Sequence, residues 1–177
     1  MRKVFRYQSQ QGKSTAATVR TAMLAGVLTL LLSSCSGVSA PPSIFELLHY
    51  EPVETLAWNN YMPGTQPRCN ASLELRLINR STDSLFFYEP EGLLVAAPDG
   101  PPLRRFPAIM TIENRRIREI DLAPGDSTVI VFRSPDFGLE PIDIEVYPRV
   151  RFILRMQSSV DLPLRIGSPV VELFDTQ

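Results

Sequence analysis

After residue 20 the sequence contains no lysine, and the whole chain has a single histidine and two cysteines. His49 is therefore the only side chain available for the neutral-pH proton transfers on which most hydrolases depend, and no G-x-S-x-G nucleophile motif accompanies it. Metal-binding patterns are missing too: there is no C-x-x-C, no histidine pair, and Met62, Met110 and Met156 are widely spaced. We expect neither an enzyme nor a cofactor or metal protein.

Acidic residues are absent from the first 45 positions, which instead carry five basic residues. An uncharged stretch from Thr21 to Ser34, "TAMLAGVLTLLLSS", follows this basic segment. A basic region followed by an apolar run is typical of a secretory signal peptide. A transmembrane helix needs about 20 apolar residues, so this stretch is too short to favour a permanent span.

The end of the apolar run, Leu32-Ser33-Ser34-Cys35, resembles the lipobox of bacterial lipoproteins. That resemblance implies a signal peptide at 1–34, cleavage before Cys35, a diacylglycerol on its thiol, and a lipidated tether at 35–42. Two or three acyl chains would hold the protein on a bilayer. Ser36, in place of the aspartate that retains such proteins at an inner membrane, favours the outer membrane if the host has two. An ordinary signal peptide with an incidental cysteine is the alternative.

Residues 43–177 are long enough for one domain with its own core. They carry 13 arginines against 19 carboxylates, a formal charge of −6, which disfavours nucleic acid as a partner. All 16 prolines follow residue 40 and predict short elements separated by frequent turns. Cys69 is the only thiol left after acylation of Cys35. We interpret it as a small buried residue, with a reactive nucleophile or an intermolecular bridge as the alternative.

Alternating apolar residues predict strands through most of this domain. "ASLELRLIN" at 71–79 alternates Leu73, Leu75 and Leu77 with polar residues. The turn "NRSTDS" follows, and "LFFYE" is expected to be its partner strand. Asp99-Gly100 is expected to supply positive-φ residues for a reversal between "LLVAA" and "LRRF".

Further strands are expected on both sides of the Pro-Gly turn in "APGDS" and at the end of the chain. They are "RRIREIDL", "TVIVFR", "RVRFILRMQ", "LPLRI" and "PVVELF". In "RVRFILRMQ" we expect Ile153 to face outward. "SIFELLHY" at 43–50 fits either a short helix with a Ser43/Glu46 capping box or a first strand, and we favour a strand or a single turn. Eight or nine short strands without a sustained helical period predict an all-β fold, a β-sandwich.

The segment from Leu73 to Phe132 resembles bacterial immunoglobulin-like domains, including BsuPI-like proteinase-inhibitor modules. The resemblance is carried by Asn79-Arg80-Ser81 after a strand, by "LFFYEPEG", by the "PDG" reversal and by "LAPGDSTVIVF". It implies a single immunoglobulin-like β-sandwich over 43–177. It covers under half of that domain, and fold alone does not confer activity.

Four residues are candidates for contact with a partner. Trp58 and Tyr61 lie in "TLAWNNYMPG", beside a Pro-Gly turn, where aromatic side chains often anchor interfaces. Arg104 and Arg105 form one of two dense basic spots and are suited to carboxylates or lipid phosphates. Core packing of Trp58 and solvated strand faces for the arginines are the alternatives.

The second basic spot is Arg115-Arg116-Arg118, to which the same two interpretations apply. The acidic run "DFGLEPIDIEV" at 136–146 lacks the spacing of a calcium loop and is read as a solvated face. From these features we expect a non-enzymatic cell-envelope lipoprotein that binds or scaffolds an envelope protein or glycan. A proteinase-inhibitor-like module acting through an exposed loop is the alternative.

Overall fold

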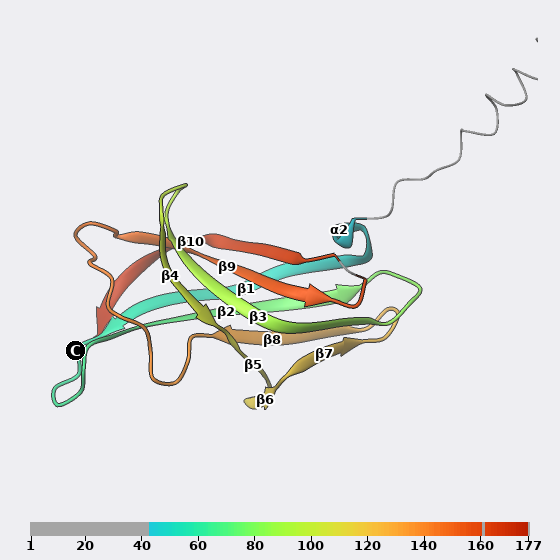
Figure 1. Cartoon of the computed structure of the whole chain (residues 1–177), viewed down its shortest axis with the longest axis horizontal. Helices are drawn as coiled ribbons and strands as arrows, with labels where there is room; N and C mark the ends of the chain where they lie inside the picture. Colours follow the sequence, from blue (N-terminus) through green and yellow to red (C-terminus); the bar gives the residue numbers. More distant parts are fainter. Residues whose placement is uncertain (1–42, 161, 177) are drawn as a thin grey trace, which may run out of the picture. The chain divides into compact units, whose positions relative to one another are not determined.

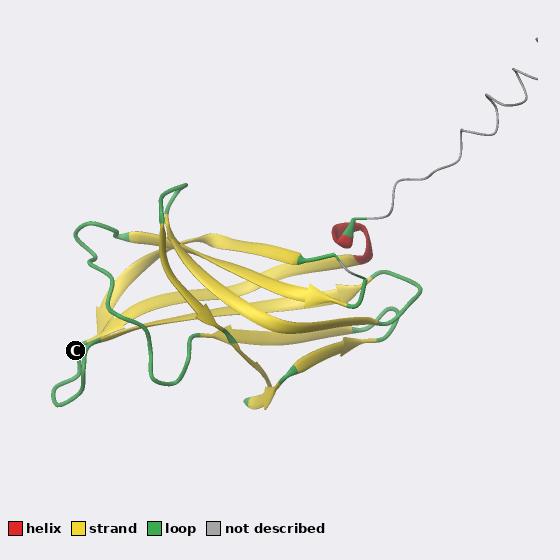
Figure 2. Cartoon of the chain, in the orientation of Figure 1, coloured by secondary structure: helices red, strands yellow, loops and turns green. Residues whose placement is uncertain are grey.

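The computed structural model describes residues 43–160 and 162–176, and these residues form an all-β sandwich (Figures 1 and 2). Cys35 and the predicted signal peptide and tether lie outside the described residues. The strands are β1 (Leu48–Asn60), β2 (Arg68–Asn79), β3 (Leu85–Ala96), β4 (Pro102–Pro107), β5 (Ile109–Ile112), β6 (Arg115–Ile117), β7 (Glu119–Leu122), β8 (Ser127–Arg133), β9 (Arg149–Ser158) and β10 (Leu164–Thr176).

The strands form two layers, visible in Figure 1. We call β1, β2, β8, β5 and β6 sheet A, and β4, β3, β9 and β10 sheet B, to which β7 is added through β3. β10 joins the two layers: its first part pairs with β9, and Leu173–Thr176 run parallel to Ala57–Asn60 of β1. The order β1-β2-β8-β5 facing β4-β3-β9-β10 is that of immunoglobulin-type sandwiches, so the expected fold is confirmed.

Alternation within the strands builds the core between the sheets. In β2 the side chains of Leu73, Leu75 and Leu77 are fully buried, while the residues between them face outward. From sheet B, the predicted set in β9 points inward to meet them: Val150, Phe152, Leu154 and Met156. A two-residue period thus produces one buried face on each sheet.

Two expectations about connections were wrong. The segment "LFFYE" does not pair with β2, because β3 crosses to sheet B and pairs there with β9, β4 and β7. The β3–β4 reversal does form, but neither Asp99 nor Gly100 has a positive φ. Backbone bonds close this loop instead, from Gly100 N to Ala96 O at 2.8 Å and from Ala96 N to Pro101 O at 3.0 Å.

Two predicted strands also differ in extent. The segment "RRIREIDL" divides at Arg118 into β6, which pairs with β5 in sheet A, and β7, which pairs with β3 in sheet B, because the chain crosses between the layers there. The segments "LPLRI" and "PVVELF" belong to the single strand β10.

Other local expectations are met. Residues Ile44–Leu47 form one helical turn, α2, before β1, although Ser43 makes no side-chain cap, so there is no capping box. Gly125 adopts φ +80° in the Pro-Gly turn that precedes β8. No helix within the described residues is long and apolar enough to cross a membrane.

The described chain enters the sandwich at the start of β1, and the loop that begins at residue 61 lies at the other end of the same strand. The helical turn α2 and the last residues of β10 lie at opposite ends of the sandwich, and loops gather at both ends (Figures 1 and 2). Trp58 lies ten residues after the first residue of β1. At roughly 3.3 Å per residue, it is about 33 Å from the point where the preceding chain joins the sheet.

Candidate functional site

The first candidate surface is an aromatic pair on the outer side of sheet A. Trp58 of β1 and Phe174 of β10 are opposite each other in the parallel ladder, and their rings stack with centroids 6.5 Å apart and planes 19° apart. Trp58 is half-buried and lies outside the core, because its neighbours Ala57 and Asn59 take the inward positions. Phe174 is 44% exposed, so the pair presents a flat apolar surface to solvent.

The loop at 61–67, between β1 and β2, continues this surface. All seven of its residues are exposed, including Tyr61 and Met62. Its shape is fixed internally: Met62 N donates to Asn60 Oδ1 at 3.0 Å, and Thr65 Oγ1 donates to Met62 O at 2.8 Å. Gly64 turns the chain at φ +82°. We call Trp58, Phe174, Tyr61 and Met62 the aromatic end of the domain.

Arg104 and Arg105, adjacent on β4, have different surroundings. Arg104 Nε donates to the carbonyl of Glu140 at 3.1 Å, and its Nη2 donates to the carbonyl of Pro141 at 2.8 Å. These bonds attach β4 to the β8–β9 connection. Arg105 faces outward from sheet B, exposed, with its Nε 3.2 Å from Glu91 Oε1. Of the two, only Arg105 is directed to the outside.

Arg105 belongs to a larger basic surface on the outer side of sheet B. In β9, the residues that alternate with the core set are Arg149, Arg151, Ile153 and Arg155. Cross-strand pairing brings Arg165 of β10 opposite Arg155, and Arg105 opposite Leu93 of β3. We call five residues the arginine face: Arg105, Arg149, Arg151, Arg155 and Arg165.

The middle of this face is apolar yet buried. Leu93 and Ile153 pair across β3 and β9 on the outer side, as expected for Ile153, but both are less than a tenth exposed. Their neighbours on that side include Arg105, Arg151 and Arg155, whose aliphatic stems can cover apolar surface while their charged ends reach water. Gly167 of β10, opposite Ile153, leaves space beside the Arg151 side chain.

The side chains considered for chemistry are poorly placed for it. Cys69 is fully buried in β2, and burial raises the pKa of its thiol to about 11, against the opposing effect of the nearby Arg104. His49 is partly exposed, with Nε2 3.3 Å from Glu51 Oε1 and no nucleophile bonded to it. No group of three metal-ligating side chains occurs within 43–160 and 162–176.

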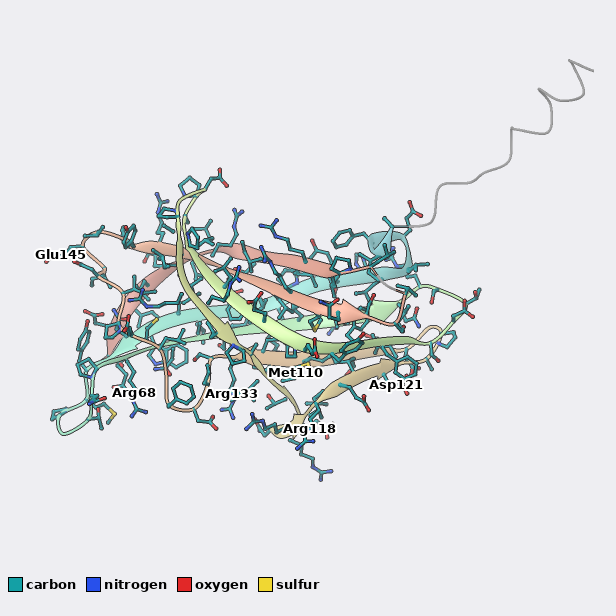
Figure 3. All side chains as sticks on the ribbon, viewed as in Figure 1. Arg68, Met110, Arg118, Asp121, Arg133 and Glu145 are labelled. Carbon is teal, nitrogen blue, oxygen red and sulfur yellow. The ribbon has the colours of Figure 1, made fainter. Side chains whose placement is uncertain are left out.

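One hollow in the described surface lies where the chain passes from sheet B to sheet A between β4 and β5. Its volume is about 610 Å³, and it is lined by β3 at Glu89 and Pro90, by residues 108–110, and by residues 116–118. Arg118, at the corner between β6 and β7, borders it (Figure 3). It holds two arginines and one glutamate around an apolar floor and has no catalytic arrangement.

The structure therefore separates the predicted contact residues into two surfaces. Trp58 and Tyr61 lie at the aromatic end, and Arg105 lies on the opposite sheet. Sequence reasoning did not identify Phe174 or the arginine face. The signal for the second was present in "RVRFILR", where arginines alternate with core residues, but only the strand pairing shows that β4 and β10 add arginines to the same side.

Comparison with known proteins gives likeness in fold alone. No family model and no curated protein matches the sequence. Among solved structures, the chain is similar to the structural genomics target SoR45 (TM-score 0.42, 9% identity, 75% of this chain and 89% of that one). It is also similar to PapD-like domain 7 of human CEP192 (0.41, 11%, 80% and 94%) and to the putative ApaA protein of Bordetella pertussis (0.35, 10%, 73% and 94%).

Proposed function

We propose that this protein is a lipid-anchored module of the bacterial cell envelope that binds another envelope component, protein or glycan, through its aromatic end. The observation that carries the binding role is the stacked pair of half-buried Trp58 and exposed Phe174, continued by exposed Tyr61 and Met62. Large aromatic side chains that remain in water after folding are the usual anchors of interfaces.

The anchor in this proposal is Cys35, from the resemblance of Leu32–Cys35 to a lipobox. In a membrane-anchored binding module, the partner bound at the aromatic end should not collide with the anchored end of the domain. The aromatic end supports this, because it lies about 33 Å along β1 from the point where the chain enters the sandwich. A partner can therefore bind the aromatic end without contacting the end of the domain at which the chain enters.

The binding role is tested by crosslinking in intact cells. A photo-reactive amino acid replaces Met62 in one strain and Phe86 in another; both side chains are exposed, but Phe86 lies at the start of β3, at the end of the sandwich that carries α2 (Figure 1). We expect a discrete adduct from position 62 that is lost when Trp58→Ala and Phe174→Ala are added, and none from position 86. Equal adducts from both positions, or an adduct that survives the double substitution, would contradict the proposal.

A second candidate function is inhibition of a proteinase, in keeping with the BsuPI-like resemblance. The observation that favours it is the exposed loop 61–67, stiffened by Pro63 and Pro67 and held by its own hydrogen bonds. A preformed loop binds a protease cleft at low entropic cost. Titration against serine, cysteine and metalloproteinases decides: inhibition abolished by Met62→Asp supports this function, and no inhibition in any class eliminates it.

A further inference from the structure

We propose that the arginine face is the surface on which the domain lies against an anionic bilayer, with arginines on the lipid phosphates and the outer side of sheet A turned away from the membrane. The inference deepens the proposed function, on whose lipid anchor it rests for its cellular setting.

Positive charge is concentrated on the arginine face. Five of the 13 arginines of residues 43–177 lie on this one sheet surface, although the domain as a whole carries −6. Three carboxylates lie among them: Glu91 and Glu172, and also Glu89, which lines one hollow together with Arg155 and Arg165. The face therefore has a net charge of +2. β7 adds Glu119 and Asp121 to the same side of the sheet, beyond the Tyr88 end of β3.

The centre of the opposite sheet offers no such excess. On the outer side of β1, β2 and β8, three carboxylates are matched by three arginines: Glu51, Glu54, Glu74, Arg68, Arg76 and Arg133. Arg115 and Arg116 lie at the edge of that sheet, on β6, and form a smaller basic group. The orientation with the arginine face toward the surface brings the larger group of arginines to the phosphates, since surface charges act within about 10 Å at physiological salt.

Several of these arginines have hydrogen-bond donors that other protein groups do not use. Arg105 and Arg155 approach Glu91 at 3.2 and 4.0 Å, so one carboxylate is shared between two guanidinium groups. Within the described residues, Arg149, Arg151 and Arg165 form no ion pair. One guanidinium group can donate two parallel hydrogen bonds to two oxygens of a phosphate, so these side chains suit a surface of phosphate groups.

The predicted tether is long enough to allow this orientation. The eight residues 35–42 between the predicted acylated cysteine and the first described residue span up to about 26 Å. The two sheets of a sandwich are separated by roughly 10 Å. A tether of this length lets either sheet contact the bilayer, so charge decides which one does.

The test uses the chain from residue 36, without the anchor, because the described residues enclose a continuous core of their own. Binding is measured by co-sedimentation with vesicles of phosphatidylglycerol and phosphatidylcholine in equal parts, and with vesicles of phosphatidylcholine alone. The variant is Arg149→Gln with Arg165→Gln, two exposed positions. The matched control is Arg115→Gln with Arg116→Gln, which are exposed on β6 and change the net charge equally.

We expect binding to the anionic vesicles only, lost at high salt. Each arginine at such a surface contributes about fivefold, so R149Q/R165Q should bind about 25-fold more weakly while R115Q/R116Q stays within a few-fold of the parent. Equal loss in both variants, binding to neutral vesicles, or no binding to anionic vesicles would overturn the inference. Binding to soluble polyglutamate without binding to vesicles would assign the face to an acidic polymer instead. The assayed chain lacks Cys35, so its binding to vesicles tests the arginine face and is independent of whether Cys35 is acylated in the cell.

Discussion

Cys69 offers a quantitative test of the conclusion that its thiol serves packing and not chemistry. Its side chain is fully buried, with the sulfur 3.8 Å from the carbonyl of Asn70, and burial raises the pKa from 9.0 to about 11. At pH 8 a shift of this size lowers the thiolate fraction about 100-fold. Because the thiolate is the reactive species, alkylation of the native protein should be slowed at least that much, and further by lack of access.

The assay is iodoacetamide labelling at pH 8, followed by mass spectrometry, on the chain from residue 36, where Cys69 is the only thiol. The native protein is compared with the same protein in concentrated urea. The expected native rate is at least 100-fold lower than the unfolded rate. A native rate within about tenfold of the unfolded rate would refute the reasoning and return Cys69 to the list of candidate nucleophiles.

The same pKa shift predicts how stability depends on pH. The folded state holds the Cys69 proton up to about pH 11, whereas the unfolded chain releases it near pH 9.0. Between those values the folded state binds more protons, so its stability falls as pH rises, by about 3 kcal/mol in full. Below pH 9 the thiol is protonated in both states, so it adds no pH dependence to the free energy of unfolding. Urea unfolding of the parent and of Cys69→Ala should diverge only in this window, and parallel curves would contradict the shift.

Two further predictions concern packing and turns. Gly92→Ala places a Cβ 2.4 Å from the buried ring of Phe106, so we expect the free energy of unfolding in urea to fall by about 1–3 kcal/mol. Phe106→Leu should partly relieve this loss, and additive effects of the two substitutions would contradict the contact. Asn79→Ala removes the hydrogen bonds from Nδ2 to Asp83 O and Leu122 O, both 2.8 Å, and should lower the free energy of unfolding by about 2–4 kcal/mol. A change under about 0.5 kcal/mol would contradict a stabilising role for these bonds.

Much of the fold could be predicted because alternation is a local property. The burial of Leu73, Leu75 and Leu77 follows from a two-residue period that each strand carries in its own sequence. The turn at Gly125 follows from Pro-Gly chemistry in the same way. Pairing between strands is not local. Nothing in "LFFYE" indicates that β3 leaves β2 for the other sheet, because both choices bury the same residues.

The candidate surfaces show the same division. Trp58 and Tyr61 could be singled out because each is a conspicuous residue beside a turn. Phe174, 116 residues after Trp58, becomes its neighbour only through the parallel pairing of β10 with β1. Arg104 and Arg105 are adjacent in sequence, yet alternation places their side chains on opposite sides of β4. They therefore do not form one basic surface in the folded domain.

The central claim is that Cys35 is the acylated first residue of the protein in its membrane. The most direct measurement is mass spectrometry of the N-terminal peptide of protein purified from the bacterial envelope. We predict a peptide that begins at Cys35 and carries a diacylglycerol on the thiol, and a Cys35→Ser variant that is not lipidated. A mature chain that begins elsewhere, or that begins at an unmodified Cys35, would contradict it.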